Sequence, residues 1–229
     1  MLNLRYAAYS CLNEYLRADK PCMDALNSEA SPKAVCEAMS KMAAVYNINR
    51  TLWRNGESCR LEGARRLLME VPRPLTDPSV AEAVDRLSHD LGAAYPRQAK
   101  GEPDEAKYAP ELLSAASKFL WMRFKDPIVM YDRFAWQWIQ RAGQLHREGS
   151  YADCLGAWRK SYADAEDEIV EVCAELVTIR RFTLAETMPE QEFRMLVGQT
   201  WFKQRVFDHA IVDAEQKREE AIKARRAVV

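Results

Sequence analysis

SKFLWMRFKDPIVMYDRFAWQWI, residues 117–139, contains the strongest structural signal of the sequence. Its first part carries apolar residues at helical spacing and ends at a Lys-Asp-Pro sequence, because proline and the residue before it disfavour a continuing helix. A short apolar run, 128–131, follows the proline. Asp132 then precedes a segment rich in tryptophan, at a position where aspartate is a favoured helix N-cap. The stretch therefore predicts two helices joined by a short connection.

The rest of the chain has the same helical character. It contains eight glycines in 229 residues and several helix-start signals: Ser31 before a proline, Ser150, and a capping box that begins at Thr187. Apolar periodicity accompanies these signals. We therefore predict an all-α protein, a multi-helix bundle with at most one very short strand, for which 128–131 is the candidate.

Residues 96–110, PRQAKGEPDEAKYAP, form the best candidate linker. They are polar, contain three prolines and a glycine, and lack apolar periodicity. They predict an N-terminal helical region, 1–95, and a C-terminal helical region, 111–229, that carries the stretch 117–139. One compact domain containing both regions is the alternative.

Composition limits the classes of function. The formal net charge is -1, so no global basic field indicates a nucleic-acid partner. No signal-peptide core and no apolar run of membrane length is present. We expect a soluble, cytoplasmic, monomeric protein with no metal, no cofactor and no membrane partner. No cysteine belongs to a C-x-x-C pair, which indicates reduced, mostly buried thiols at Cys11, Cys22, Cys36, Cys59, Cys154 and Cys173.

Lys118 and Asp132 are the two residues of 117–139 whose role the pattern leaves open. The helical projection places Lys118 away from an apolar face, on the side where a lysine is solvated and needs no function. Asp132 needs no function beyond capping a helix. Large apolar groups beside a charge are nevertheless typical of a partly closed pocket. The flanking groups are Trp121 and Met122 beside the lysine, and Trp136 and Trp138 after the aspartate.

A family resemblance gives these two residues a candidate chemistry. The pattern S-K-F-L, proline, I-V-M-Y-D-R-F, together with WFKQRVFD at 201–208, resembles bacterial proteins of the 8-oxoguanine branch of the helix-hairpin-helix DNA glycosylase superfamily. The resemblance implies a glycosylase-like helical fold in which a lysine attacks the sugar. It also implies that an aspartate at the start of the next helix stabilises the sugar cation or assists proton transfer. By motif position, Lys118 and Asp132 would take these roles.

The chain departs from that family at the hairpin. The family's hairpin is rich in glycine, because its backbone N–H groups approach a DNA phosphate closely. Residues 113–117, LSAAS, contain no glycine. Either Ser114 or Ser117 donates to the phosphate instead, or DNA binding has been lost. The sequence thus leaves two functions open: a DNA glycosylase, or a non-catalytic helical module that binds nucleic acid or protein.

The glycosylase interpretation assigns roles to several neighbours. Such an enzyme flips a damaged or modified base out of duplex DNA, or acts on a single strand. A lysine attacks only when it is neutral. Apolar neighbours such as Trp121 and Met122 would favour that form, as would a positive field from Arg123 or Arg133. Tyr131, Trp136 and Trp121 are candidates to stack on the flipped base, although core packing is the commoner fate of an aromatic side chain. Base-excision repair and defence against phages with modified DNA are the two biological settings considered.

Charge is distributed unevenly along the chain. Residues 33–73 contain eight basic and four acidic residues, whereas 153–186 contain four basic and eight acidic ones. This asymmetry is typical of a protein with one phosphate-facing side, although ordinary ion-paired helix surfaces explain it as well. The candidate phosphate-binding residues of the basic segment are Arg50, Arg54, Arg65 and Arg66.

Overall fold

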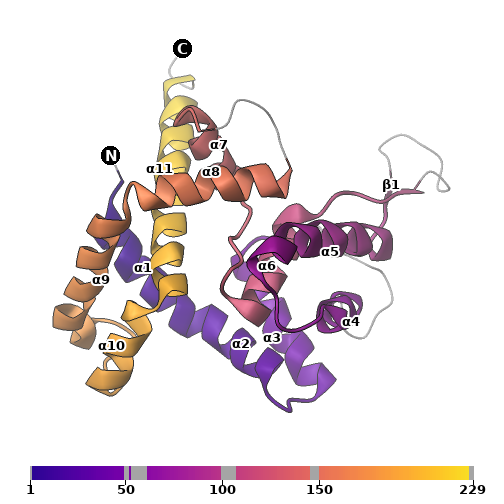
Figure 1. Cartoon of the computed structure of the whole chain (residues 1–229), viewed down its shortest axis with the longest axis horizontal. Helices are drawn as coiled ribbons and strands as arrows, with labels where there is room; N and C mark the ends of the chain where they lie inside the picture. The colour runs from indigo at the N-terminus through magenta and orange to yellow at the C-terminus, as the bar shows by residue number, and fades with distance from the viewer. Residues whose placement is uncertain (1, 49–51, 53–60, 99–106, 145–149, 227–229) are drawn as a thin grey trace. The chain divides into compact units, whose positions relative to one another are not determined.

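The structure is a computed structural model that describes the chain except for residues 1, 49–51, 53–60, 99–106, 145–149 and 227–229 (Figure 1). It confirms the all-α prediction. The described residues are mostly helical, and their strands are limited to an antiparallel pair, β1 (Arg97–Gln98) and β2 (Lys107–Tyr108). Residues 128–131, the predicted place for a strand, have no regular secondary structure.

The helices fall into two compact units. Unit 1 comprises residues 1–17 and 131–229, and unit 2 comprises residues 18–130. This division differs from the predicted boundary at 96–110, which lies inside unit 2. The reason is that α5 (Val80–Ala94) and α6 (Leu113–Phe124), on either side of that segment, pack against each other.

Two contacts fix the α5–α6 pairing. The backbone N–H of Leu112 donates to the Ser88 hydroxyl at 2.8 Å. A side chain at Gly92 would collide with the carbonyl of Pro110, so the absence of a Cβ at this position permits the close approach. The polar, proline-rich segment is therefore a connection between two packed helices of one unit.

Unit 2 is a closed set of helices. Each helix packs against the next along the chain, and α6 also packs against α2, the first of them. Because α6 has neighbours on more than one side, every residue from 115 to 122 is buried. Besides α5 and α6, the elements of this unit are α2 (Lys20–Asn27), α3 (Pro32–Val45), α4 (Glu62–Glu70) and the 3₁₀ turn η2 (Asp77–Ser79).

Unit 1 is organised around its longest helix, α11 (Thr200–Arg226), shown in yellow in Figure 1. This helix packs against α1, α7, α9 and α10. The π-helical turn η1 (Tyr15–Asp19) continues α1 toward α2. The other elements are α1 (Leu4–Glu14), α7 (Arg133–Arg141), α8 (Tyr151–Ala163), α9 (Glu166–Ile179), η3 (Arg180–Phe182) and α10 (Glu190–Gly198).

Three of the four predicted helix starts are confirmed. Ser31 and Ser150 accept backbone N–H groups of α3 and α8, and Asp132 does the same for α7. The capping box predicted at Thr187 is wrong. There the chain is still in a turn, and α10 begins after Pro189, which has no hydroxyl to accept a hydrogen bond.

The prediction for the cysteines is confirmed where the structure describes them. Five are free and buried, and Cys59 lies outside the described residues. Burial raises the pKa of Cys22, Cys154 and Cys173 to about 12, which keeps these thiols protonated at neutral pH.

Among the described helices, none combines the length and the apolar character that crossing a membrane requires.

Candidate functional site

Lys118 is buried inside unit 2. The residue is 4 % exposed, and its neighbours on α6 are buried as well. The expectation that Lys118 lies on a solvated helix face is therefore wrong, because α2 and α5 both pack on α6 and leave little of it in water. Lysine is almost never fully buried without a compensating environment. Burial thus makes Lys118 a stronger candidate for function than its sequence position did.

The Lys118 amine lies against a hydroxyl and an aromatic ring. Its Nζ donates to Ser114 Oγ at 3.0 Å and lies 5.6 Å from the centre of the Tyr46 ring, within the range of a cation–π contact. The Tyr46 hydroxyl in turn donates to the Asp19 carboxylate at 2.9 and 3.0 Å. We call Ser114, Lys118, Tyr46 and Asp19 the lysine cluster.

Sequence reasoning missed half of the lysine cluster. Asp19 is 2 % exposed and ends the π-helical turn η1, while Tyr46 follows α3. Neither residue lies in a motif around Lys118. The only sequence signal was an aspartate within an otherwise helical apolar pattern, and only tertiary packing shows that it is buried.

Three predicted site residues on α6 belong to the core. Trp121 is 1 % exposed and Met122 is fully buried, so neither presents a surface on which a flipped base stacks. Ser117 is also fully buried, and its hydroxyl donates to the Ser114 carbonyl at 3.4 Å. This hydroxyl therefore faces the backbone of its own helix, and the phosphate contact of Ser117 stays a prediction. Ser114 is half-buried and is a partner of Lys118.

Asp132 caps α7 in unit 1. Its Oδ1 accepts the backbone N–H of Phe134 at 2.9 Å, and the residue is half-buried. The helix-cap interpretation is confirmed. Lys118 belongs to unit 2 and Asp132 to unit 1. A cleft shared by the two residues stays a prediction.

The residues around Asp132 differ in how far a ligand can reach them. Trp136 is buried and contacts the half-buried Tyr131 in a tilted arrangement, with ring centres 5.8 Å apart. Arg133 is exposed, stacks on the Phe134 ring and pairs with Glu219 at 3.4 Å. Of the predicted substrate contacts in this unit, Tyr131 and Arg133 remain accessible, whereas Trp136 is part of the core.

A buried carboxyl, Asp208, lies near Asp132 in unit 1. It accepts a hydrogen bond from Trp158 Nε1 at 2.7 Å and one from Arg205 Nη1 at 3.2 Å. Burial raises the pKa of Asp208 to about 6, and the negative charge of Asp132 acts in the same direction. Sequence reasoning used the segment 201–208 only as a resemblance. It missed that this segment buries a charged pair.

The Asp208 pair continues into a polar network between α1 and α11. Arg205 lies 3.6 Å from the Glu14 carboxylate and 3.2 Å from His209, whose own ring lies 3.3 Å from Glu14. Burial lowers the pKa of His209, which favours its neutral form. The network therefore joins two helices of unit 1 through buried polar contacts.

The predicted basic patch is partly neutralised. Arg65 and Arg66 both donate to the Glu62 carboxylate, at 2.8 and 3.0 Å. These hydrogen bonds lower the pKa of Glu62 to about 2. Arg66 is exposed and Arg65 half-buried, while Arg50 and Arg54 lie outside the described residues.

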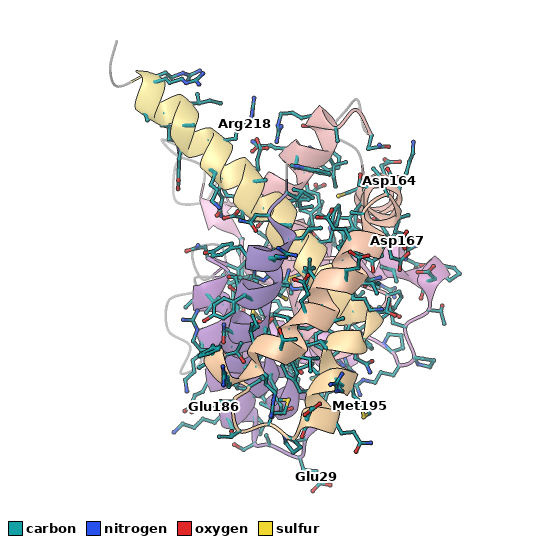
Figure 2. The ribbon with its side chains drawn as sticks, turned by 90° about the vertical axis from the view of Figure 1, so that its left-hand side faces the viewer. Glu29, Asp164, Asp167, Glu186, Met195 and Arg218 are labelled. Atoms are coloured by element: carbon teal, nitrogen blue, oxygen red, sulfur yellow. The ribbon has the colours of Figure 1, made fainter. Side chains whose placement is uncertain are left out.

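The acidic segment has a local structural cause. Asp164 and Asp167 stand at the surface where α8 passes into α9 (Figure 2). The first turn of α9 contains Glu166, Asp167 and Glu168, and carboxylates there interact favourably with the positive end of the helix dipole. The acidic character of this surface therefore needs no ligand.

Comparisons with known proteins identify no relative. No family model, no curated protein and no solved structure matches the chain. Within the described part of the chain, no group of three or more metal-ligating side chains is close enough to hold an ion.

Proposed function

We propose that the protein is a DNA glycosylase that excises a damaged or modified base, with Lys118 as the attacking amine. One observation carries the proposal: the Lys118 side chain is buried in unit 2 against Ser114 and Tyr46. The hydroxyl and the ring hold the amine at one position inside unit 2, and a positioned nucleophile reacts faster than one that is free to move. The motif resemblance around 117–139 assigns the same residue.

The proposed reaction is a substitution at the sugar. The neutral amine forms a bond to C1′ of a flipped nucleotide, and the bond from C1′ to the base breaks, so that the base leaves with the electron pair and takes up a proton. Loss of a proton from nitrogen and opening of the sugar ring give an imine, the intermediate of a lyase. Asp132 would stabilise the positive charge that develops on the sugar.

Neighbouring residues have distinct parts in this proposal. Ser114 and Tyr46 would position the amine, and Asp19 would hold the Tyr46 ring through its hydroxyl. Tyr131 and Arg133, the accessible residues beside Asp132, would contact the nucleotide. Because Lys118 is 4 % exposed, substrate binding has to open a path to its Nζ.

The second candidate function is a non-catalytic helical module that binds nucleic acid or protein. The observation that favours it is the cap at α7, since the Asp132 carboxylate already has a structural role there. In this case Lys118 would be a buried structural lysine, held by the hydroxyl and the ring that surround it.

Borohydride trapping on DNA with an abasic site separates the two functions. Borohydride reduces an imine between a protein amine and the sugar to a stable covalent adduct, so trapping reports an attacking amine. We expect the wild-type protein to be trapped, Lys118→Met to lose trapping, and Lys41→Met, a change at an exposed lysine of α3, to retain it. Methionine has a similar length and suits a buried position. A thermal melt of each variant verifies folding.

Two results would contradict the glycosylase proposal. Trapping that persists in folded Lys118→Met would assign the amine to another residue. A wild-type protein that is not trapped and releases no base from an oligonucleotide containing 8-oxoguanine, the base of the resembled family, would favour the non-catalytic module.

A further inference from the structure

Two arginines of unit 2 share one aromatic ring. The Arg123 Cζ atom lies 5.0 Å and the Arg73 Cζ atom 5.5 Å from the centre of the Phe124 ring. Arg123 belongs to the last turn of α6, and Arg73 to the loop that follows α4. Both guanidinium groups therefore lie beside the same small surface, at the end of the helix that carries Lys118.

The partners of these arginines are neutral groups. Arg123 Nη1 donates to the Leu68 carbonyl in α4, and Arg73 Nη2 donates to the Arg123 carbonyl at 3.4 Å and to the side-chain oxygen of Asn27. Neither arginine forms an ion pair with a carboxylate of the described chain. Other arginines of the protein do, such as Arg65 with Glu62.

Carbonyl contacts offset only part of this charge. The C-terminal end of a helix carries about half a negative elementary charge. The ends of α4 and α6 together supply about one, against two full positive charges, so about one positive charge remains. Burial lowers the pKa of Arg123, and the positive charge of Arg73 lowers it further, so the two cations oppose each other.

The site also has unused hydrogen-bonding capacity. The Nε atom of Arg123 is buried and has no hydrogen-bond partner. An arginine presents five N–H donors in a planar fork that matches the oxygens of a phosphate. Lys125 follows α6, and its pKa responds to the charges of Asp24 and Lys20, which pair with each other at 2.7 Å.

We propose that Arg73 and Arg123 bind a phosphate group, and that this phosphate belongs to the backbone of a DNA strand. The first part rests on the arginine pair alone, and the second part rests on the proposed function. The bound anion would lie between two cations that otherwise repel each other. It would also replace the glycine-rich phosphate anchor that residues 113–117 lack.

The position of the arginine pair suits an anchor for the proposed substrate. Arg123 follows Lys118 by five residues on α6, which corresponds to about 7.5 Å along the helix axis. A strand held at this end of α6 therefore stays within the unit that contains the attacking amine.

Arg73→Gln is the principal test, because Arg73 is exposed and its replacement leaves the core intact. Arg86→Gln, at an exposed arginine of α5 in the same unit, is the matched control. Arg123→Lys is the second variant, since lysine keeps the charge and a donor for the Leu68 carbonyl but loses the planar fork. Melting in sodium chloride without phosphate verifies the folding of all three.

The first measurement uses inorganic phosphate. We expect phosphate, compared with chloride at equal ionic strength, to raise the Tm of the wild type and of Arg86→Gln by about 3 °C at ten times Kd. Arg73→Gln should lose this rise, and Arg123→Lys should show a smaller one. Equal rises in all four proteins, or none in any, would overturn the phosphate site.

The second measurement uses fluorescence anisotropy of a duplex oligonucleotide across a range of salt concentrations. Losing one phosphate contact lowers the slope of log K against log salt by about 0.9. We expect this decrease in Arg73→Gln and no change in Arg86→Gln. An unchanged slope in a protein that is still trapped through Lys118 would refute the anchor and leave the glycosylase proposal standing. If phosphate raised the Tm but the protein did not bind DNA, the phosphate site would stand. The assignment of that phosphate to DNA, and the proposed function with it, would be refuted.

Discussion

Replacing Asp132 with asparagine separates its structural role from its proposed chemical role. Asparagine accepts the Phe134 N–H as aspartate does, so the cap at α7 is retained. Losing the charge at a helix N-terminus costs about 0.3–1 kcal/mol. Removing the repulsion between Asp132 and the buried Asp208 acts in the opposite direction. We therefore expect the free energy of unfolding of Asp132→Asn to lie within about 0.5 kcal/mol of the wild-type value.

Asp132→Ala is the matched control for the cap. Alanine has no acceptor for the Phe134 N–H, and losing such a cap costs about 1 kcal/mol. For a protein of this size, that corresponds to a Tm about 2–4 °C below that of Asp132→Asn. Equal melting of the two variants would refute the structural importance of the cap.

The chemical role predicts a different ordering of the same variants. Neither asparagine nor alanine carries the negative charge that a developing sugar cation needs, and losing such a group costs roughly 10²–10³-fold in rate. Single-turnover release of 8-oxoguanine from an oligonucleotide should therefore be slow in both variants, although only one is destabilised. Base release at the wild-type rate by folded Asp132→Asn would show that Asp132 is a helix cap alone.

Two further predictions concern buried and paired carboxyl groups. Because the pKa of Asp208 is raised from 3.8 to about 6, the folded state holds a proton that the unfolded state releases between these values, and wild-type stability falls as pH rises through them. The free energy of unfolding of Asp208→Asn should consequently rise relative to that of the wild type, by up to about 3 kcal/mol between pH 4 and pH 7. Urea unfolding of both proteins at each pH measures this difference. A difference that does not change with pH would refute the raised pKa of Asp208. Glu62→Gln removes a carboxylate whose pKa is lowered to about 2, so the variant should lose the stability that this carboxylate contributes above pH 4.5. Because Glu62 is partly exposed, we expect this loss in the free energy of unfolding to be about 1 kcal/mol. The same change releases Arg65 and Arg66 and should tighten oligonucleotide binding in an anisotropy titration, whereas unchanged affinity would exclude this pair as a phosphate-binding surface.

Local sequence patterns predict most of the helices. Helix starts at Ser31, Asp132 and Ser150 were predictable because a cap is a hydrogen bond to a backbone group two or three residues away. The all-α class followed from the same local signals. The one cap that failed, Thr187, lies in a turn before a proline, where two possible helix starts compete within a few residues.

Which side chains are buried depends on how the helices pack against one another. A helical projection shows one apolar face, but α6 packs against α2 as well as α5, and the second contact buries Lys118 together with Trp121. The same packing explains why the linker-like segment 96–110 lies inside a unit.

The groups that carry the proposals come from distant parts of the chain. Asp19 precedes α2 and Tyr46 follows α3, yet the Tyr46 hydroxyl donates to the Asp19 carboxylate. Arg73 and Arg123 contact the same ring although 50 residues separate them in the sequence. Local pattern cannot predict such contacts, because their formation depends on the free energy of packing whole helices together and not on the preferences of neighbouring residues. The physical basis of the candidate site is therefore tertiary, while the helices that position it are encoded locally.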